Sequence, residues 1–303
     1  MTVVETPSVK LATALVLDVA YESVNDDSAD TVVLLHGFPY DPRAFDQVVP
    51  MLAARGKRVI VPYLRGFGPT RFRDPTTLRS GQQAALGHDL VELMDALGVS
   101  RAVVAGYDWG GRAACVAAAV FPERVVGLVS ANAYNIQHIA SSSTPIAPEA
   151  EATFWYQYYF QTARGRRGLE QNRDRLGELL WCTWSPTWPG AAEAFARSSP
   201  SLHNPDFVDV VVHSYRHRFG AVDGDPRYEQ TEGRLATQPD IAVPTIFLES
   251  LASGLGVGPA SASAHRFTGP FELRPLPGVG HNPAQEAPTE FASAVLDVEA
   301  SAL

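Results

Sequence analysis

Short runs of apolar, mostly β-branched residues recur along the first half of the chain without regular alternation with polar residues. They are "TVVLLHG" (31–37), "KRVIVPY" (57–63), "SRAVVAG" (100–106) and "VVGLVSAN" (125–132). A strand that is covered on both faces has this pattern. The segments between the runs have helical periodicity, at 43–55, 80–97 and 110–121. The alternation of strand and helix predicts an α/β fold with a mostly parallel sheet and helices on both faces.

The alternation stops after residue 135. A linker-like stretch (141–151) follows, and beyond it the chain is rich in Trp, Tyr and Arg, with no apolar run typical of a buried strand. "VPTIFLES" (243–250) and "FELRPLPG" (271–278) resume the earlier pattern, and a last helix is expected near 283–300. The chain therefore divides into three predicted parts: a first core segment at 1–134, a helical cap at 135–240 and a second core segment at 241–303.

Length and charge narrow the classes of function. The 303 residues suffice for one compact body with an inserted subdomain, and 33 acidic against 24 basic residues give a net charge of -9. This charge repels phosphate backbones, so nucleic acid is not an expected partner. Asp18 interrupts the N-terminal apolar stretch, and no run is long enough to span a bilayer. Cys115 and Cys182 have neither zinc nor disulfide-framework spacing, which favours the cytoplasm.

The stretch "VVAGYDWGGRAAC" (103–115) places Asp108 between two glycines, directly after a predicted strand. Glycines at these positions allow the tight strand-to-helix turn that exposes a nucleophile. An aspartate there could be only the N-cap of the next helix, but the paired glycines favour a nucleophile. A carboxylate that attacks a saturated carbon leaves an ester that water can open, whereas a serine would leave an ether. Asp108 therefore predicts displacement at saturated carbon, with epoxides and alkyl halides as substrates.

Hydrolysis of such an ester needs a base and donors for an oxyanion. "GVGHNPAQEAP" (278–288) places His281 in a loop between the last strand and the last helix, where a base is expected, although the residue could also be a capping histidine. "LLHGFPYDP" (34–42) follows a strand and offers the backbone N–H of Phe38, which the N–H of Trp109 would join. The same turn could instead be only rigid structure.

Four motifs occur in an order that resembles the α/β-hydrolase family, and within it the epoxide hydrolases together with the haloalkane dehalogenases. They are "HGFP" (36–39), "RGFGPT" (65–70), "GYDWGG" (106–111) and "PGVGHNPAQEAP" (277–288). The resemblance covers nearly the whole chain and is closest to soluble epoxide hydrolases. It implies an α/β-hydrolase fold with an inserted helical cap.

The resemblance also implies two cap tyrosines that hold the oxirane oxygen. "WYQYYFQ" (155–161) matches the first at Tyr156, and "HSYRHRFG" (213–220) matches the second at Tyr215. Two phenol groups aimed across a cleft would protonate the strongly basic alkoxide as the ring opens. Aromatic residues at helical spacing also commonly pack a core, so packing is the alternative interpretation.

Dehalogenases are expected to bind the departing halide with a second donor besides the residue after the nucleophile. Trp109 would serve as the first donor, but the family's asparagine after the His-Gly pair is Phe38 here. The tryptophans of "LLWCTWSPTW" are expected to line an apolar substrate pocket or to pack; they are Trp181, Trp184 and Trp188. Epoxide hydrolysis is therefore the leading prediction, with haloalkane dehalogenation as its alternative.

The charge-relay acid of the family is missing from its expected positions. Ser253 occupies the usual position after the strand at 243–250, and Asn132 occupies the backup position. Glu249 is the nearest acid, within or at the end of that strand. Without an acid behind His281, hydrolysis of the ester should slow down. A natural-product-modifying enzyme or a ligand-binding homologue remains a further alternative.

Together these features predict a cofactor-independent and metal-free epoxide hydrolase that acts on a bulky, apolar small molecule as a monomer or homodimer. Two arginines near the motifs are expected to have other roles. Arg65 is predicted to tie a loop beneath the site, and Arg112 is predicted to be a surface or interface charge.

Overall fold

The structure is a computed structural model that describes residues 8–132, 134–256 and 260–301. A nine-stranded sheet forms its centre. In spatial order the strands are β1 (Lys10–Thr13), β2 (Leu17–Val24), β4 (Arg58–Pro62), β3 (Thr31–Leu35), β6 (Ala102–Tyr107), β7 (Val125–Ala131), β8 (Thr245–Ser250) and β9 (Phe271–Leu276), while β5 (Arg71–Phe72) pairs with β2 outside this row.

Six strands that are neighbours in the sheet run parallel, as the apolar runs predict; they are β4, β3, β6, β7, β8 and β9. Val32, Val33 and Leu34 are completely buried, which is the result expected for consecutive side chains on a sheet covered on both faces. The sequence patterns did not predict β1, β2 and β5, which are antiparallel. The strand β2 contains Glu22, which is buried because it forms an ion pair with Arg43.

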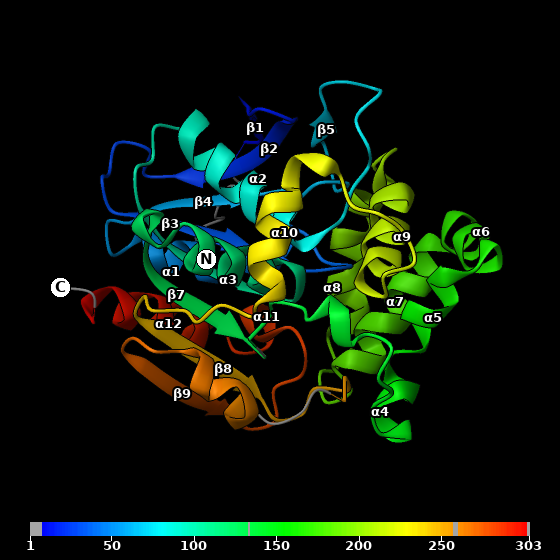
Figure 1. Ribbon diagram of the computed structural model, residues 1–303. Helices are drawn as coiled ribbons and strands as arrows, with labels where there is room; N and C mark the ends of the chain where they lie inside the picture. Colours follow the sequence, from blue (N-terminus) through cyan, green and yellow to red (C-terminus); the bar gives the residue numbers. More distant parts are fainter. Residues whose placement is uncertain (1–7, 133, 257–259, 302–303) are drawn as a thin grey trace.

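Helices cover both faces of the sheet (Figure 1). One face carries α2 (Gln83–Ala96), α3 (Asp108–Val120) and α10 (Glu229–Ala236), and the other carries α1 (Val48–Ala53) and α12 (Pro288–Ala300). The short helix α11 (Pro283–Glu286) precedes α12. This arrangement confirms the α/β fold with helices on both faces that the sequence predicts.

The helices from α4 to α9, between β7 and β8, form a group beside the sheet, which we call the helical insertion (Figure 1). Its helices are α4 (Pro148–Thr153), α5 (Trp155–Gln161), α6 (Ala163–Gln171), α7 (Arg173–Trp184), α8 (Ala191–Ser198) and α9 (Phe207–Arg218). The segment predicted as a linker at 141–151 includes the start of α4. The domain boundaries at 135 and 240 stay a prediction, and α10, which falls between them, contacts α2 and α3.

Hydrogen bonds join the insertion to the turn after β3. The hydroxyl of Ser201 donates to Asp41 Oδ2 at 2.6 Å, and the indole N–H of Trp181 donates to the carbonyl of Pro39 at 3.0 Å. Ser201, Asp41, Trp181 and Pro39 are all buried, so water competes weakly for these hydrogen bonds. Within the described ranges, the structure contains no helix with the length and apolar character needed to cross a membrane.

Candidate active site

The turn from β6 to α3 holds Asp108 in a left-handed backbone conformation, with φ at 53°. Both neighbouring glycines are required by close approach. A Cβ on Gly110 would lie 2.0 Å from the carbonyl oxygen of Leu35, and a Cβ on Gly106 would lie 2.6 Å from the carbonyl carbon of Gly110. The turn therefore packs directly against the end of β3, as the elbow motif predicts.

The Asp108 carboxylate is held by two backbone groups and faces one imidazole. Its Oδ1 accepts from the N–H of Phe38 at 2.8 Å and from its own neighbour, the N–H of Trp109, at 2.7 Å. Its Oδ2 lies 3.5 Å from His281 Nε2. The two N–H groups predicted to stabilise an oxyanion thus converge on a single oxygen of the predicted nucleophile.

Charges around Asp108 keep this carboxyl ionised. Burial alone would raise its pKa, but the contact with His281, the charge of Arg112 and the N–H of Phe38 outweigh burial and lower the pKa below its usual value. Asp108 is also the first residue of α3, where the helix dipole favours negative charge. At neutral pH the side chain is therefore available as a nucleophile.

The loop after β9 fixes the backbone of His281. Its N–H donates to the carbonyl of Trp184 at 3.1 Å and to Ser185 Oγ at 3.0 Å. Ser185 Oγ in turn donates to Glu286 Oε1 at 2.7 Å, and Glu286 also accepts from the N–H groups of Gly280 and Asn282. Sequence reasoning missed Glu286, although it lies only five residues after His281. A carboxylate beside a tight loop with several free N–H donors was the available signal.

On the far side of the imidazole, no acid of the described residues is bonded to the ring. Across the residues that the structure describes, His281 Nδ1 has no hydrogen-bond partner. Asn132 accepts from the N–H of Ser250 at 3.0 Å and donates to the carbonyl of His281 at 3.5 Å, so it ties the loop rather than the ring. Ser253 Oγ accepts from the N–H of Leu255 at 3.3 Å, and Glu249 lies within β8.

The two predicted tyrosines come together above the elbow. Tyr156 on α5 and Tyr215 on α9 are both buried, and their rings pack edge to face at 5.3 Å. Phe38 lies against both, at 6.4 Å and 5.5 Å between ring centres. Tyr158 is 41% exposed on the outer side of α5, so it does not compete for the assignment.

The hydroxyls of this pair stay protonated. Burial raises the pKa of Tyr215 well above its usual value of 10 and raises the pKa of Tyr156 to about 12, although the charge of Arg218 opposes both increases. Tyr156 accepts a hydrogen bond from Gln157 Nε2 at 3.0 Å. The hydroxyl of Tyr215 interacts with that of Tyr156 and has no other polar partner within the described ranges, so it can turn toward a ligand.

The predicted pocket tryptophans lie at different distances from these groups. Trp184 packs 5.2 Å from the rings of both His281 and Tyr156. Trp181 packs on Tyr40 and uses its indole N–H for the turn after β3, and Trp188 stacks on the far side of Trp181. Only Trp184 therefore borders the candidate site directly.

Three further side chains test the predictions. Arg65 makes a bidentate ion pair with Asp89, with both hydrogen bonds at 2.6 Å. This pair confirms the predicted structural role of Arg65 in tying its loop. Cys115 is buried on α3, where its small side chain packs in the core. The prediction for Arg112 is wrong: only 6% of this residue is exposed, because the residues after β7 and the end of α9 cover its side of α3.

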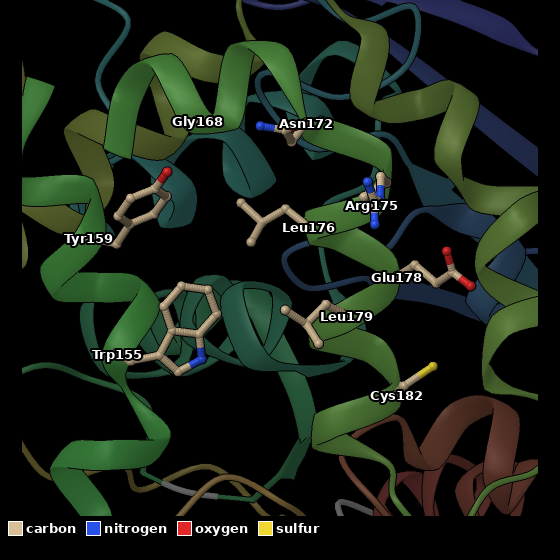
Figure 2. Close-up of a pocket in the computed structure, with 9 residues that line it drawn as sticks. All are labelled: Trp155, Tyr159, Gly168, Asn172, Arg175, Leu176, Glu178, Leu179 and Cys182. Carbon is tan, nitrogen blue, oxygen red and sulfur yellow. The ribbon is translucent and has the colours of Figure 1, made fainter. Parts of the chain in front are cut away.

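A separate hollow lies on the helical insertion. Figure 2 shows Trp155 and Tyr159 of α5 facing Leu176 and Leu179 of α7. The space between them has a volume of about 650 Å³. None of the predicted catalytic side chains lines it. The hollow is therefore not the site built around Asp108.

Comparison with known proteins agrees with this architecture. Residues 30–212 match the model of the alpha/beta hydrolase fold family, so the chain belongs to this family. It is 42% identical to a Klebsiella pneumoniae protein of known structure that is described as a candidate epoxide hydrolase. The two structures superpose with a TM-score of 0.95 over 97% of each chain. The predicted fold and family are confirmed.

Curated relatives carry epoxide hydrolase names. Epoxide hydrolase A of Mycobacterium tuberculosis is 25% identical over 307 residues, which cover 90% of this chain and 91% of that protein. Bifunctional epoxide hydrolase 2 of Sus scrofa is 34% identical over 149 residues. The chain spans 26% of the length of the pig protein and 57% of the length of epoxide hydrolase B of Mycobacterium tuberculosis.

Proposed function

We propose that this protein is an epoxide hydrolase that works through an ester of Asp108. The observation that carries the proposal is that the two oxygens of the Asp108 carboxylate have different partners. Oδ1 accepts hydrogen bonds from two backbone N–H groups, whereas Oδ2 faces His281. Epoxide hydrolase names among relatives of the chain support the same activity.

In the first step, Asp108 Oδ2 attacks one oxirane carbon and the bond between that carbon and the ring oxygen breaks. The oxygen leaves as an alkoxide, which takes a proton from Tyr215 or Tyr156. Both phenols are protonated at neutral pH, so they act as acids in this step. The product is a hydroxyalkyl ester of Asp108.

In the second step, His281 Nε2 removes a proton from a water molecule whose oxygen attacks Asp108 Cγ. Negative charge then develops on Oδ1, which already accepts from Phe38 and Trp109, so the donors are in place before the charge appears. The bond between Cγ and Oδ2 then breaks, and Oδ2 takes the proton from the His281 imidazolium as it leaves in the diol. The new carboxyl gives its proton to the tyrosinate formed in the first step, and the oxygen of the water takes the place of Oδ2 in the Asp108 carboxylate.

The unpartnered side of His281 sets the relative rates of these steps. An imidazolium forms only in the second step, and no acid of the described residues stabilises it at Nδ1. We therefore expect alkylation of Asp108 to be faster than hydrolysis of the ester. The ester should then accumulate during turnover.

Intact-protein mass spectrometry tests the proposal. The protein is mixed with styrene oxide and other aryl epoxides, quenched within seconds, and compared with an Asp108→Ala variant. The expected result is an added mass equal to one epoxide in the wild type alone, together with diol in solution. Failure to form either adduct or diol with any epoxide would contradict the proposal.

Haloalkane dehalogenation is a second candidate, and one observation favours it. The indole N–H of Trp109 is buried beside the nucleophile and has no acceptor within the described ranges. Such a donor suits a departing halide. Halide release from 1-chlorobutane or 1,2-dibromoethane, absent in the Asp108→Ala variant, would support this activity over epoxide opening.

A further inference from the structure

Two arginines from distant parts of the chain meet beside the candidate active site. Arg112 lies one turn after Asp108 on the same side of α3, and Arg218 lies at the end of α9. The side-chain amide of Gln137 lies between them. With its oxygen toward them, it accepts from Arg218 Nη2 at 2.7 Å and from Arg112 Nη2 at 3.2 Å.

Neither arginine has a carboxylate partner among the described residues. Arg112 Nε donates to the carbonyl of Asn135 at 3.3 Å, and Arg218 Nη1 donates to Gln157 Oε1 at 3.0 Å. All the acceptors of this pair are thus uncharged amides.

This arrangement is unusual for a buried guanidinium group such as that of Arg112, which lies beside the half-buried Arg218. Arg65 is similarly buried in the same protein, and its Nε and Nη2 both donate to the carboxylate of Asp89. By contrast, burial and the charge of Arg218 lower the pKa of Arg112 to about 10. A buried cation that has no carboxylate in direct contact and faces a like charge is costly unless a ligand supplies a second anion.

The charges around Arg112 and Arg218 sum to one unbalanced positive charge. Arg112 faces Arg218 and Asp108, together with the neutral hydroxyls of Tyr156 and Tyr215. Two positive charges therefore meet one carboxylate, which is the nucleophile itself. A substrate carboxylate would balance the second positive charge, and it would bring no net repulsion to Asp108.

We propose that Arg112 and Arg218 bind a carboxylate of the substrate, so that the natural substrates are epoxides with an apolar body and a carboxylate close to the oxirane. Guanidinium groups match carboxylates in shape and charge. The position of Arg112, one helical turn from the nucleophile, places this group near the reacting carbon. The inference rests on the proposed function for the reaction, but the recognition of the anion can be measured without turnover.

The main competing role is control of the two tyrosines. Arg218 lies over the ring of Tyr215 at 5.1 Å and reaches the hydroxyl of Tyr156 through Gln157. Burial raises the pKa of Tyr156, and the charge of Arg218 opposes that rise. Arginines with this role alone would speed the opening of neutral and anionic epoxides equally.

The first experiment compares two epoxides that differ only in charge, trans-3-phenylglycidate and trans-3-phenylglycidamide. The ratio of their kcat/KM values should favour the carboxylate in the wild type and fall roughly 10- to 100-fold in Arg112→Gln and Arg218→Gln. Arg173→Gln is the matched control, since Arg173 also lies over an aromatic ring and donates to a neutral carbonyl. A ratio that stays constant in both variants would overturn the proposal.

The second experiment measures binding of unreactive analogues to the wild type by calorimetry. Cinnamate should bind at least tenfold more tightly than cinnamamide, and Arg112→Gln should remove this difference. Diol formation through Asp108 without any preference for cinnamate would overturn the anion site and leave the proposed function intact. Arginine-dependent cinnamate binding without epoxide opening would support the anion site and contradict the proposed function.

Discussion

The two halves of the candidate site are built in different ways. The core half supplies backbone N–H groups, from Phe38 and Trp109, whose positions follow from strand ends and a tight turn. The insertion half supplies side chains, Tyr156 and Tyr215, held by the packing of two helices. In the proposed mechanism, the backbone donors bind an ester carbonyl that is the same for every substrate. Side chains from the insertion meet the variable part, so we infer that specificity resides there.

The largest effect that separates the halves should come from His281→Gln. This change removes the base on the core side, so hydrolysis of the ester should fall roughly 10³-fold or more, while alkylation of Asp108 continues. The ester should then persist at one equivalent per protein in intact-mass spectra, with diol release lost. His88→Gln is the control, because His88 packs far from the elbow, against Phe121 and Tyr228. An ester that turns over at the wild-type rate would refute the assignment of the base.

The next effect should come from the insertion half. Tyr156→Phe and Tyr215→Phe should each slow alkylation about 10- to 100-fold, and the double change should slow it roughly 10³-fold or more, because the alkoxide loses its acids. Rapid-quench measurement of adduct formation checks this. Hydrolysis of the ester should change little in these variants.

Tyr159→Phe serves as the comparison variant, since Tyr159 faces the separate hollow on the insertion (Figure 2). If the double variant slows hydrolysis as strongly as alkylation, the division of labour between the halves is wrong.

A smaller effect should come from Glu286→Gln. Glu286 acts through Ser185 and the loop N–H groups that place His281, so it is a positioning residue. We expect roughly tenfold slower ester hydrolysis, with an altered pH profile for that step and unchanged alkylation. Glu290→Gln, on the exposed start of α12, is the control. Equal slowing of both steps would indicate general damage to the fold instead of misplacement of the base.

The smallest effect concerns Asp41, which lies in the turn after β3 and accepts a hydrogen bond from Ser201 of the helical insertion. Burial raises the pKa of Asp41 to about 6, although Ser198, Ser201 and Arg43 oppose this increase. The native state then holds a proton that the unfolded chain has lost, so stability falls as pH rises from about 4 to about 6. Asp41→Asn removes this titration and can keep a hydrogen bond to Ser201.

The stability of Asp41→Asn relative to the wild type should therefore rise by about 1 kcal/mol between pH 5 and pH 7.5, as urea unfolding would measure. Asp209→Asn, a surface change on α9, is the control. A relative stability that is independent of pH would contradict the buried, protonated state of Asp41.

The core was predictable from sequence because its elements carry local signals. Buried parallel strands appear as apolar runs, and Gly106 and Gly110 mark a turn in which a Cβ would collide with the backbone. The strand β2 was missed because its polar residue Glu22 is paired with Arg43 from a later element. Pairing between distant residues leaves no mark in local periodicity.

The candidate site was predictable to the same extent. Asp108 and His281 each lie in a motif, and the structure brings them within 3.5 Å of each other. Arg112 was misplaced because its burial depends on Gln137 and Arg218, which reach it from other segments. Helical spacing shows which face a residue occupies, but it does not show what covers that face.

The resting contacts of Asp108 Oδ1 also limit which other reactions this fold can run here. Both backbone donors already bind the carboxylate of Asp108, our proposed nucleophile, so neither of them is free to polarise the carbonyl of a foreign ester or amide. We infer that Asp108, by occupying both donors, disfavours acyl transfer from a foreign ester. Acyl transfer is the reaction for which enzymes with a serine at the same turn are suited. A single exchange to serine at position 108 would vacate the two donors and open a route to esterase activity.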